Sequence, residues 1–226
     1  MFLELSYAYS ETMPIYPGLP EESFEPHKRI MNGDEGNTTL IKHFLHNGTH
    51  VDAPFHFDAQ GLPIDKVPIE DFIYEHPVVI KKKLNKSELL RAEDIKAYGD
   101  VLQSADLLLF YTGYCELRGD TVAYTDDFPA VSEEAAQFIR DELLNVKAVA
   151  IDTLSIESAT RGPQENFKVH RTFLNSQLSS NRPLLVYEDV NIGKIIGRTV
   201  KRIYAFPLRL QGLDASPVNM VAEVVN

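Results

Sequence analysis

The segment from residue 46 to residue 56 constrains this chain more than any other part of its sequence. Its three histidines and one aspartate are His46, His50, Asp52 and His56, all at even-numbered positions. Successive side chains of an extended strand point to opposite faces, so these four would share one face of a strand. A lone histidine is more often structural, but this face carries 3 of the 7 histidines of the chain beside an acid. Imidazole and carboxylate are preferred ligands of zinc and manganese, and the segment therefore predicts a metal site.

A flat strand cannot bring these side chains to one ion, because His46 and His50 would lie about 13 Å apart along it. Gly48 permits unusual backbone angles, so we expect a bend there. Pro54 cannot donate a ladder hydrogen bond, and the chain should leave its sheet after Asp52. With a bend at Gly48 and an exit from the sheet near Pro54, the chain would curl so that its ligand side chains surround one centre. His56 is then either a further ligand or a free base.

Further donors are needed, because catalytic zinc typically has about three protein ligands and a water. His170 precedes a helix-like run, and Glu188 ends an apolar run, 184–187, that predicts a buried strand. A buried acid at that place needs a partner, and a metal ion is one. An ordinary acid in a turn with Asp189 is an equally good interpretation of Glu188 from spacing alone.

The remaining pattern predicts a mixed α/β fold in which strands outnumber helices. We expect a helix to follow Ser132, a good N-cap with two glutamates in the first turn, and to end near residue 144. We interpret the polar segment 21–36 as a loop that covers the site or a partner's site. Strands are expected at 3–8, 77–82, 105–112, 147–152, 184–187, 201–210 and 218–225, and further helices at 91–98 and after His170. The metal-bearing segment is 38–57.

Length and charge exclude several classes of protein. The 226 residues fit one domain, 1–226, with a sizeable core. The net charge of -11 argues against nucleic-acid binding, and no run is long enough to span a bilayer. The single cysteine, Cys115, and the lack of a visible signal peptide predict a cytoplasmic protein. Burial of Cys115 as a small apolar side chain is expected more than a role as nucleophile or ligand.

The pattern His46-x-Gly-Thr-His50-x-Asp52-Ala-Pro-x-His56 resembles the cyclase-like metal-dependent hydrolases, which include bacterial kynurenine formamidases and isatin hydrolase. The resemblance continues in residues 5–6 and 13–18, in the Thr-Gly-aromatic element at 111–114, in the Asp-x-x-Ser element at 151–157, and in 170–171, 188 and 216–218. It implies a three-layer β/β/α fold of the swivelling-domain kind and a homo-oligomer, either dimer or tetramer.

The resemblance also implies a role for each site residue. His46, His50, Asp52, His170 and Glu188 would bind one or two divalent ions, zinc before manganese, and His56 would be the catalytic acid and base. Two features depart from the family pattern. The gap between His170 and Glu188 is long, and tyrosines stand at 111 and 114 where many members carry Arg and Trp.

The leading hypothesis from the resemblance is an arylformamidase of tryptophan catabolism. It would cleave N-formylkynurenine to kynurenine and formate with a metal-activated water. A hydrolase of an isatin-like lactam or another small amide comes next. A metal-dependent lyase, dehydratase or cyclase, and a binding protein with a structural or sensed ion, are the remaining alternatives. A Ser-His-Asp mechanism through Ser155 is disfavoured, because no Gly-x-Ser-x-Gly turn surrounds it.

Overall fold

A nine-stranded mixed sheet organises the protein in the computed structural model, which describes residues 1–225. The strands β6, β8, β10 and β11 are parallel, whereas β4, β13 and β12 continue the sheet in antiparallel fashion. The order along the sheet is β5 (Ile73–Tyr74), β12 (Thr199–Pro207), β13 (Ala215–Val225), β4 (His50–Asp52), β11 (Leu185–Glu188), β10 (Ala148–Ile151), β8 (Leu107–Tyr111) and β6 (Pro77–Lys81), with β1 (Phe2–Glu4) on β13.

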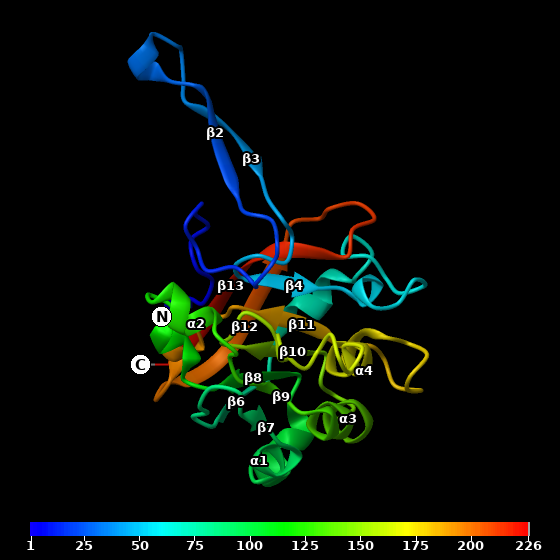
Figure 1. The fold of residues 1–226 in the computed structure, drawn as a ribbon. Coiled ribbons are helices and arrows are strands. Elements are labelled where there is room, and N and C mark those ends of the chain that lie inside the picture. The colour runs from blue at the N-terminus through cyan, green and yellow to red at the C-terminus, as the bar shows by residue number, and fades with distance from the viewer. Residues whose placement is uncertain (226) are drawn as a thin grey trace.

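The alternation along β8 shows how the layers form. Leu107 and Leu109 point into an inner apolar cluster, together with Met220 of β13, whereas Leu108 and Phe110 point to a second cluster under the helices. The sheet curls over the inner cluster until β12 contacts β6, so that it is nearly a barrel. The helices α1 (Ala92–Lys96), α3 (Glu133–Glu142) and α4 (Lys168–Leu174) cover the second cluster (Figure 1). The expected three-layer mixed α/β fold is confirmed.

Shorter elements connect these layers. They are the helix α2 (Thr121–Thr125), the paired strands β7 (Leu89–Leu90) and β9 (Ala130–Val131), and the 3-10 helices η1 (Ile30–Asn32), η2 (Pro54–His56), η3 (Ile69–Phe72), η4 (Gly99–Ser104), η5 (Tyr114–Leu117) and η6 (Ile192–Ile195).

Local sequence patterns located most of the regular elements. Ser132 caps α3 as expected, because its hydroxyl accepts a hydrogen bond from the backbone N–H of Ala135. The metal-bearing segment 38–57 contains the strands β3 (Thr38–Lys42) and the three-residue β4. One expectation was wrong: the helix expected after His170 begins at Lys168, so that His170 lies inside it.

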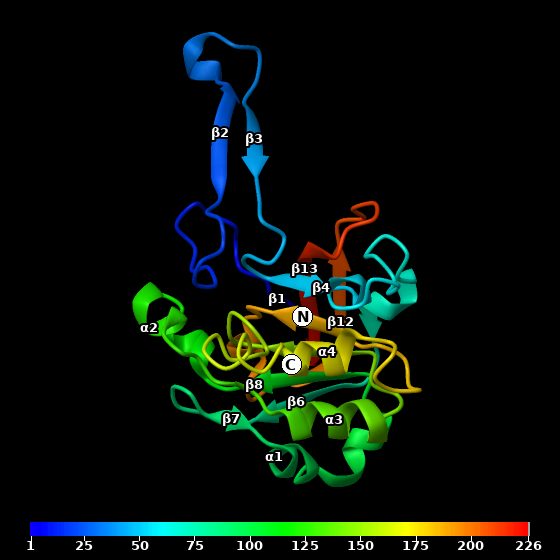
Figure 2. The ribbon, with the colours of Figure 1, turned by 45° about the vertical axis from the view of Figure 1, so that its right-hand side comes forward.

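The segment expected to be a polar loop is part of a β-hairpin. Within the described part of the chain, its strands β2 (Ser23–Lys28) and β3 (Thr38–Lys42) pair only with each other, and the hairpin projects away from the body in both views (Figures 1 and 2). Every residue of β3 is exposed. We call residues 23–42 the arm.

Within residues 1–225, no helix combines the length and the apolar character needed to cross a membrane.

Candidate metal centre

The register of β4 brings three of the predicted ligands together. This strand lies between β13 and β11, and His50 stands directly opposite Glu188. Val51 points into the inner cluster, so His50 and Asp52 point to the other face, which Glu188 shares as a cross-strand neighbour. All three side chains are buried. Strand pairing therefore places two carboxylates and an imidazole at one point.

A turn before β4 and the end of the strand after it bring His46 and His56 to the same place. Gly48 has a φ of +66°, and a Cβ atom there would lie 2.8 Å from Cε1 of Tyr9, so both the backbone angle and the space favour glycine at the turn that carries His46. Pro54 ends the extended segment and opens η2, which carries His56. The sequence predicted both breaks.

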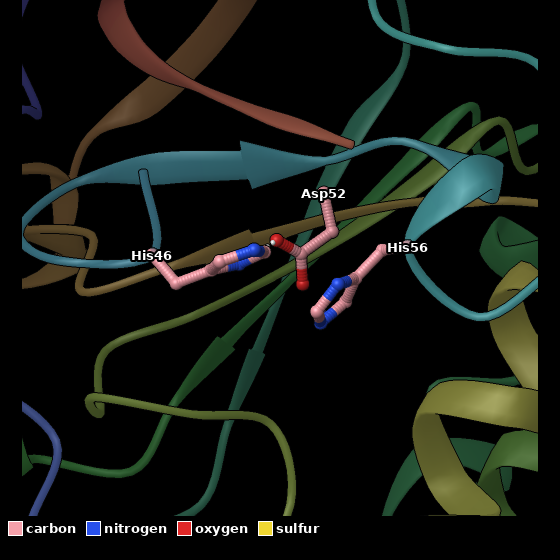
Figure 3. A group of neighbouring side chains, drawn as sticks. All are labelled: His46, Asp52 and His56. Atoms are coloured by element: carbon pink, nitrogen blue, oxygen red, sulfur yellow. Dashed lines mark hydrogen bonds and ion pairs between the residues drawn. The ribbon is translucent and has the colours of Figure 1, made fainter. Parts of the chain in front are cut away.

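His46, Asp52 and His56 point toward one another from three different local structures (Figure 3). The ring centroids of His46 and His56 are 4.1 Å apart, and Nδ1 of His46 is 2.9 Å from Oδ1 of Asp52. The expectation that all four even-numbered side chains share a face of one strand was wrong. Only His50 and Asp52 do so, because the turn and the 3-10 helix on either side of the short strand supply the others.

Two potential ligand groups share Asp52: one with His46 and His56, the other with His50 and Glu188. Nε2 of His50 lies 3.4 Å from Oδ1 of Asp52 and 3.5 Å from Oε2 of Glu188. Nε2 of His50 and Oδ2 of Asp52 are buried and have no hydrogen-bond partner among residues 1–225. Buried polar atoms are normally paired, so this cluster fits a divalent cation that would complete it. The shared carboxylate suits one ion or two.

His170 and Glu188 meet at the same place despite the long gap between them. Nε2 of His170 is 3.1 Å from Oε1 of Glu188 and 3.8 Å from Oδ2 of Asp52. The same Oε1 accepts hydrogen bonds from Ser155 Oγ at 3.1 Å and from the backbone N–H of Ile156 at 2.7 Å. Glu188 is thus directed into the cluster and is not an acid of a surface turn.

Outer partners orient two of the imidazoles. Nδ1 of His50 donates to the carbonyl of Gly48, and Nδ1 of His170 donates to Oε2 of Glu157, each at 2.8 Å. In the neutral rings, Nδ1 therefore keeps the proton and Nε2 presents its lone pair to the centre, as at many metal sites. Sequence reasoning missed this role of Glu157, although the residue stands in the Asp-x-x-Ser element.

Asp214 is a second acid that sequence reasoning missed. Its Oδ2 atom lies 2.8 Å from Nε2 of His46 and 3.3 Å from Nδ1 of His56, so one carboxylate oxygen bridges the two imidazole rings. Its backbone carbonyl also accepts from the N–H of Ala53. Asp214 stands in a turn just before β13, and the only available signal was its closeness to the Ser-Pro-Val element.

Mutual stabilisation of opposite charges shifts the pKa values in the cluster. Burial alone would lower the pKa of His170, but hydrogen bonds to Glu157 and Glu188 outweigh it and raise the value to about 10. Burial likewise opposes the rise in the pKa of His46 to about 9, which Asp52 drives. Burial would raise the pKa of Glu188, yet its hydrogen bond from His170 helps to lower it to about 2. The metal-free centre therefore holds protons that a divalent ion would displace.

A cavity of about 320 Å³ opens over the cluster. Ligand sites of this kind combine an apolar wall with a few convergent polar groups. The floor consists of His46, Asp52, His56, Ser155, His170 and Glu188, and the walls of Tyr16, Leu19, Phe44, Phe57, Leu154 and Phe167. No residue of the arm lines this cavity, so the arm does not cover the site of its own chain.

The Thr-Gly and Asp-x-x-Ser elements bind each other outside the cavity. The carboxylate of Asp152 accepts hydrogen bonds from the N–H groups of Thr112 and Gly113, at 2.9 and 3.0 Å. These bonds join the ends of β10 and β8 and support the loop that carries Ser155. Cys115 beside them is half-buried, and burial raises the pKa of its thiol to about 12, so it stays protonated at neutral pH.

The arrangement of ligands, orienting acids and cavity agrees with a comparison to protein families. Residues 3–158 match the Cyclase family, described as "Putative cyclase", and the chain belongs to this family. The match includes His46, His50, Asp52 and His56, whereas His170 and Glu188 lie beyond it.

Solved structures share the fold along nearly the whole chain. Isatin hydrolase A from Ralstonia solanacearum aligns with 100% of this chain and 92% of its own, at 20% identity and a TM-score of 0.83. Isatin hydrolase A from Labrenzia aggregata, bound to benzyl benzoate, aligns with 100% and 94%, at 19% identity and a TM-score of 0.83. A predicted metal-dependent hydrolase from Bacillus stearothermophilus aligns with 98% and 97%, at 23% identity and a TM-score of 0.72.

Proposed function

We propose that this chain is a metal-dependent hydrolase of a small aromatic amide. One observation carries the proposal: two buried ligand atoms without partners, Nε2 of His50 and Oδ2 of Asp52, belong to a cluster that floors a largely aromatic cavity. A closed structural metal site would have no such cavity above it. The names of the similar solved structures, isatin hydrolase and metal-dependent hydrolase, support the same reaction class.

His46, His50, Asp52, His170 and Glu188 would bind the ion or ions, with zinc or manganese as the candidates. When bound, such an ion lowers the pKa of water and polarises a carbonyl oxygen.

His56 is proposed as the general acid and base. It lines the cavity, and its Nδ1 atom faces Asp214 at 3.3 Å, which favours the tautomer whose Nε2 atom is free to accept a proton. His56 would take the proton of the attacking water as the new C–O bond forms. It would then deliver that proton to the leaving nitrogen as the C–N bond breaks.

The cavity favours an uncharged aryl amide. Tyr16, Phe44, Phe57 and Phe167 offer ring faces and edges to an aromatic group, and no lysine or arginine is among the lining residues of the described chain. A cyclic amide such as isatin meets these conditions. N-formylkynurenine, the substrate of an arylformamidase, carries a carboxylate that no cation of the described lining would meet, and we place it second.

The first experiment measures turnover of isatin and of N-formylkynurenine by protein loaded with zinc or with manganese. Ring opening of isatin that a chelator abolishes would support the first substrate, and release of formate would support the arylformamidase and a place in tryptophan catabolism. Full metal loading without turnover of these or other small amides would contradict the hydrolase and favour a binding protein. Product formed without addition of water would instead favour a lyase or cyclase.

Two variants test the residue roles. His56→Ala should lower kcat by about 100-fold or more while metal content stays near that of the wild type. An equal loss of metal would make His56 a ligand. His50→Ala should lose metal, and the exposed His76→Ala is the matched control, expected to retain both metal and activity.

We also propose that the protein is a homo-oligomer held by the arm. A two-stranded hairpin is at best marginally stable alone, yet this one leaves Ile30, Met31, Leu40 and Ile41 between 59% and 88% exposed. The base of the arm is firmly anchored, because the buried Glu22 bonds to His43, Asn47 and the backbone N–H of Phe44. An anchored arm with apolar side chains along its free part suits symmetric packing against a second copy.

Light scattering after size-exclusion chromatography tests the assembly. The wild type should elute as a dimer or tetramer, and Leu40→Glu with Ile41→Glu should shift it to the monomer. Val122→Glu, at a position of 77% exposure on α2, is the control and should leave the mass unchanged. A monomeric wild-type protein would overturn the proposal.

A further inference from the structure

A buried ion pair lies directly beside the candidate metal centre, outside the cavity. Asp189 follows Glu188 in the chain, is fully buried, and has a φ of +52°, in the left-handed region. Its carboxylate binds Arg118 in bidentate fashion, with Nε to Oδ1 at 2.8 Å and Nη2 to Oδ2 at 2.7 Å. The hydroxyl of Tyr124 donates to the same Oδ1 at 2.7 Å. Three side-chain bonds thus fix one residue in an unfavourable backbone conformation.

The backbone of Asp189 ties three segments of the centre together. Its N–H donates to the carbonyl of Thr153 at 2.7 Å, and its carbonyl accepts from Oγ1 of Thr49 at 2.7 Å. Thr49 immediately precedes the ligand His50, and Thr153 lies two residues before Ser155, which bonds to Glu188. Asp189 is therefore the junction of β4, β11 and the loop after β10.

Arg118 is close to this junction but not to the centre itself. It lies between η5 and α2, its guanidinium is 3.7 Å from the ring centroid of Tyr7, and it is absent from the lining of the cavity. A buried ion pair adds little net stability to a fold, because desolvation of the charges offsets their attraction. Its effect here is geometric, since a bidentate fork fixes both the position and the plane of the carboxylate.

We propose that Arg118 is a positioning residue of the metal centre. Its ion pair fixes Asp189, and the backbone of Asp189 in turn sets where Glu188 and His50 meet the ion. The inference rests on the proposed metal centre and adds to it a residue that touches neither ion nor substrate.

Metal affinity provides a test that does not depend on turnover. The dissociation constant for zinc would be measured by chelator competition in wild type, Arg118→Lys, Arg118→Gln and Asp189→Asn, each checked for folding by circular dichroism. Arg118→Lys keeps the charge but loses the fork, and Asn tolerates positive φ, so both are expected to fold. Zinc should bind about 10- to 100-fold more weakly in these variants, the usual effect of losing an outer-shell partner.

Asp106→Asn is the matched control. Asp106 is a buried acid just before β8 that accepts hydrogen bonds from the N–H groups of Glu75 and His76, remote from the ligands in the sheet. Its variant should melt at a lower temperature with an unchanged dissociation constant.

A double-mutant cycle separates positioning from general damage. If Arg118 acts through Asp189, Arg118→Gln with Asp189→Asn should weaken zinc binding much less than the product of the single effects. Folded Arg118 variants that bind zinc within twofold of wild type, or fully additive effects, would overturn the inference and leave the proposed function intact. A wild-type protein that binds neither zinc nor manganese would overturn both.

Discussion

Binding of the ion should release protons, because the metal-free centre holds its histidines in the charged form. The pKa values of about 9 for His46 and about 10 for His170 leave each ring roughly nine-tenths or more protonated at pH 7.5. The pKa of His50 is raised as well, because burial, which would lower it, is outweighed by the nearby carboxylates of Asp52 and Glu188. A ring must lose a proton to offer a lone pair to a metal, so we expect release of at least about two protons per protein.

The same argument sets the pH dependence of metal affinity. Each displaced proton makes the apparent binding constant rise about tenfold per pH unit while the free ring is charged. With two rings, affinity should increase by about 10⁴-fold between pH 6.5 and pH 8.5. Calorimetry in buffers of different ionisation enthalpy counts the protons, and chelator competition across this range gives the slope.

The stability of the metal-free protein should change in the opposite direction. The folded pKa values of His46 and His170 lie above the ordinary value of 6.5, so their contribution to stability is complete below pH 6.5 and lost as the pH rises through 9 to 10. A tenfold difference in proton affinity between the folded and unfolded states corresponds to about 1.4 kcal/mol. The pKa of Glu188 is lowered to about 2, so its contribution is complete above pH 4.5 and lost below it. Metal binding without proton release, or an affinity independent of pH, would refute the charge assignment.

Three further predictions concern single residues and the ion. Glu157→Gln should weaken metal binding about 10- to 100-fold in chelator competition, because His170 loses its orienting carboxylate; unchanged affinity would contradict this role. Gly48→Ala should lower the free energy of unfolding in urea by more than the about 1–2 kcal/mol that positive φ alone costs, since the new methyl would meet the Tyr9 ring. Gly212→Ala, at a φ of +74° in open space, is its control, and equal losses would show that the Tyr9 ring yields freely. A chelator should lower the melting temperature of the loaded protein, whose stabilisation reaches about 2.7 kcal/mol when free metal is 100 times its dissociation constant; an unchanged melting temperature would argue against a bound ion.

Local patterns predicted the parts of the fold that local physics decides. The apolar run at 105–112 contains β8, and the run at 184–187 covers β11 up to its last residue, Glu188, because a strand buried on both faces needs apolar side chains on both. Ser132 marked the start of α3, because its hydroxyl can satisfy a free N–H of the first turn. The arm was not predicted, because the segment 21–36 is mostly polar and has no clear period, and the strands β2 and β3 pair with each other and not with the main sheet.

The sequence by itself determined which residues could form a metal site and where the chain would turn around them. Three histidines and an acid within eleven residues, with Gly48 and Pro54 as the breaks, were sufficient for that prediction. The tertiary structure decided which distant groups complete the site. Glu188 faces His50 only through the pairing of β4 with β11, and Asp214 approaches His46 from a segment remote in sequence. Glu157 reaches His170 because the intervening loop folds back onto α4. The physical reason is that strand register and loop closure are set by burial of the whole sheet, which no short segment of sequence contains.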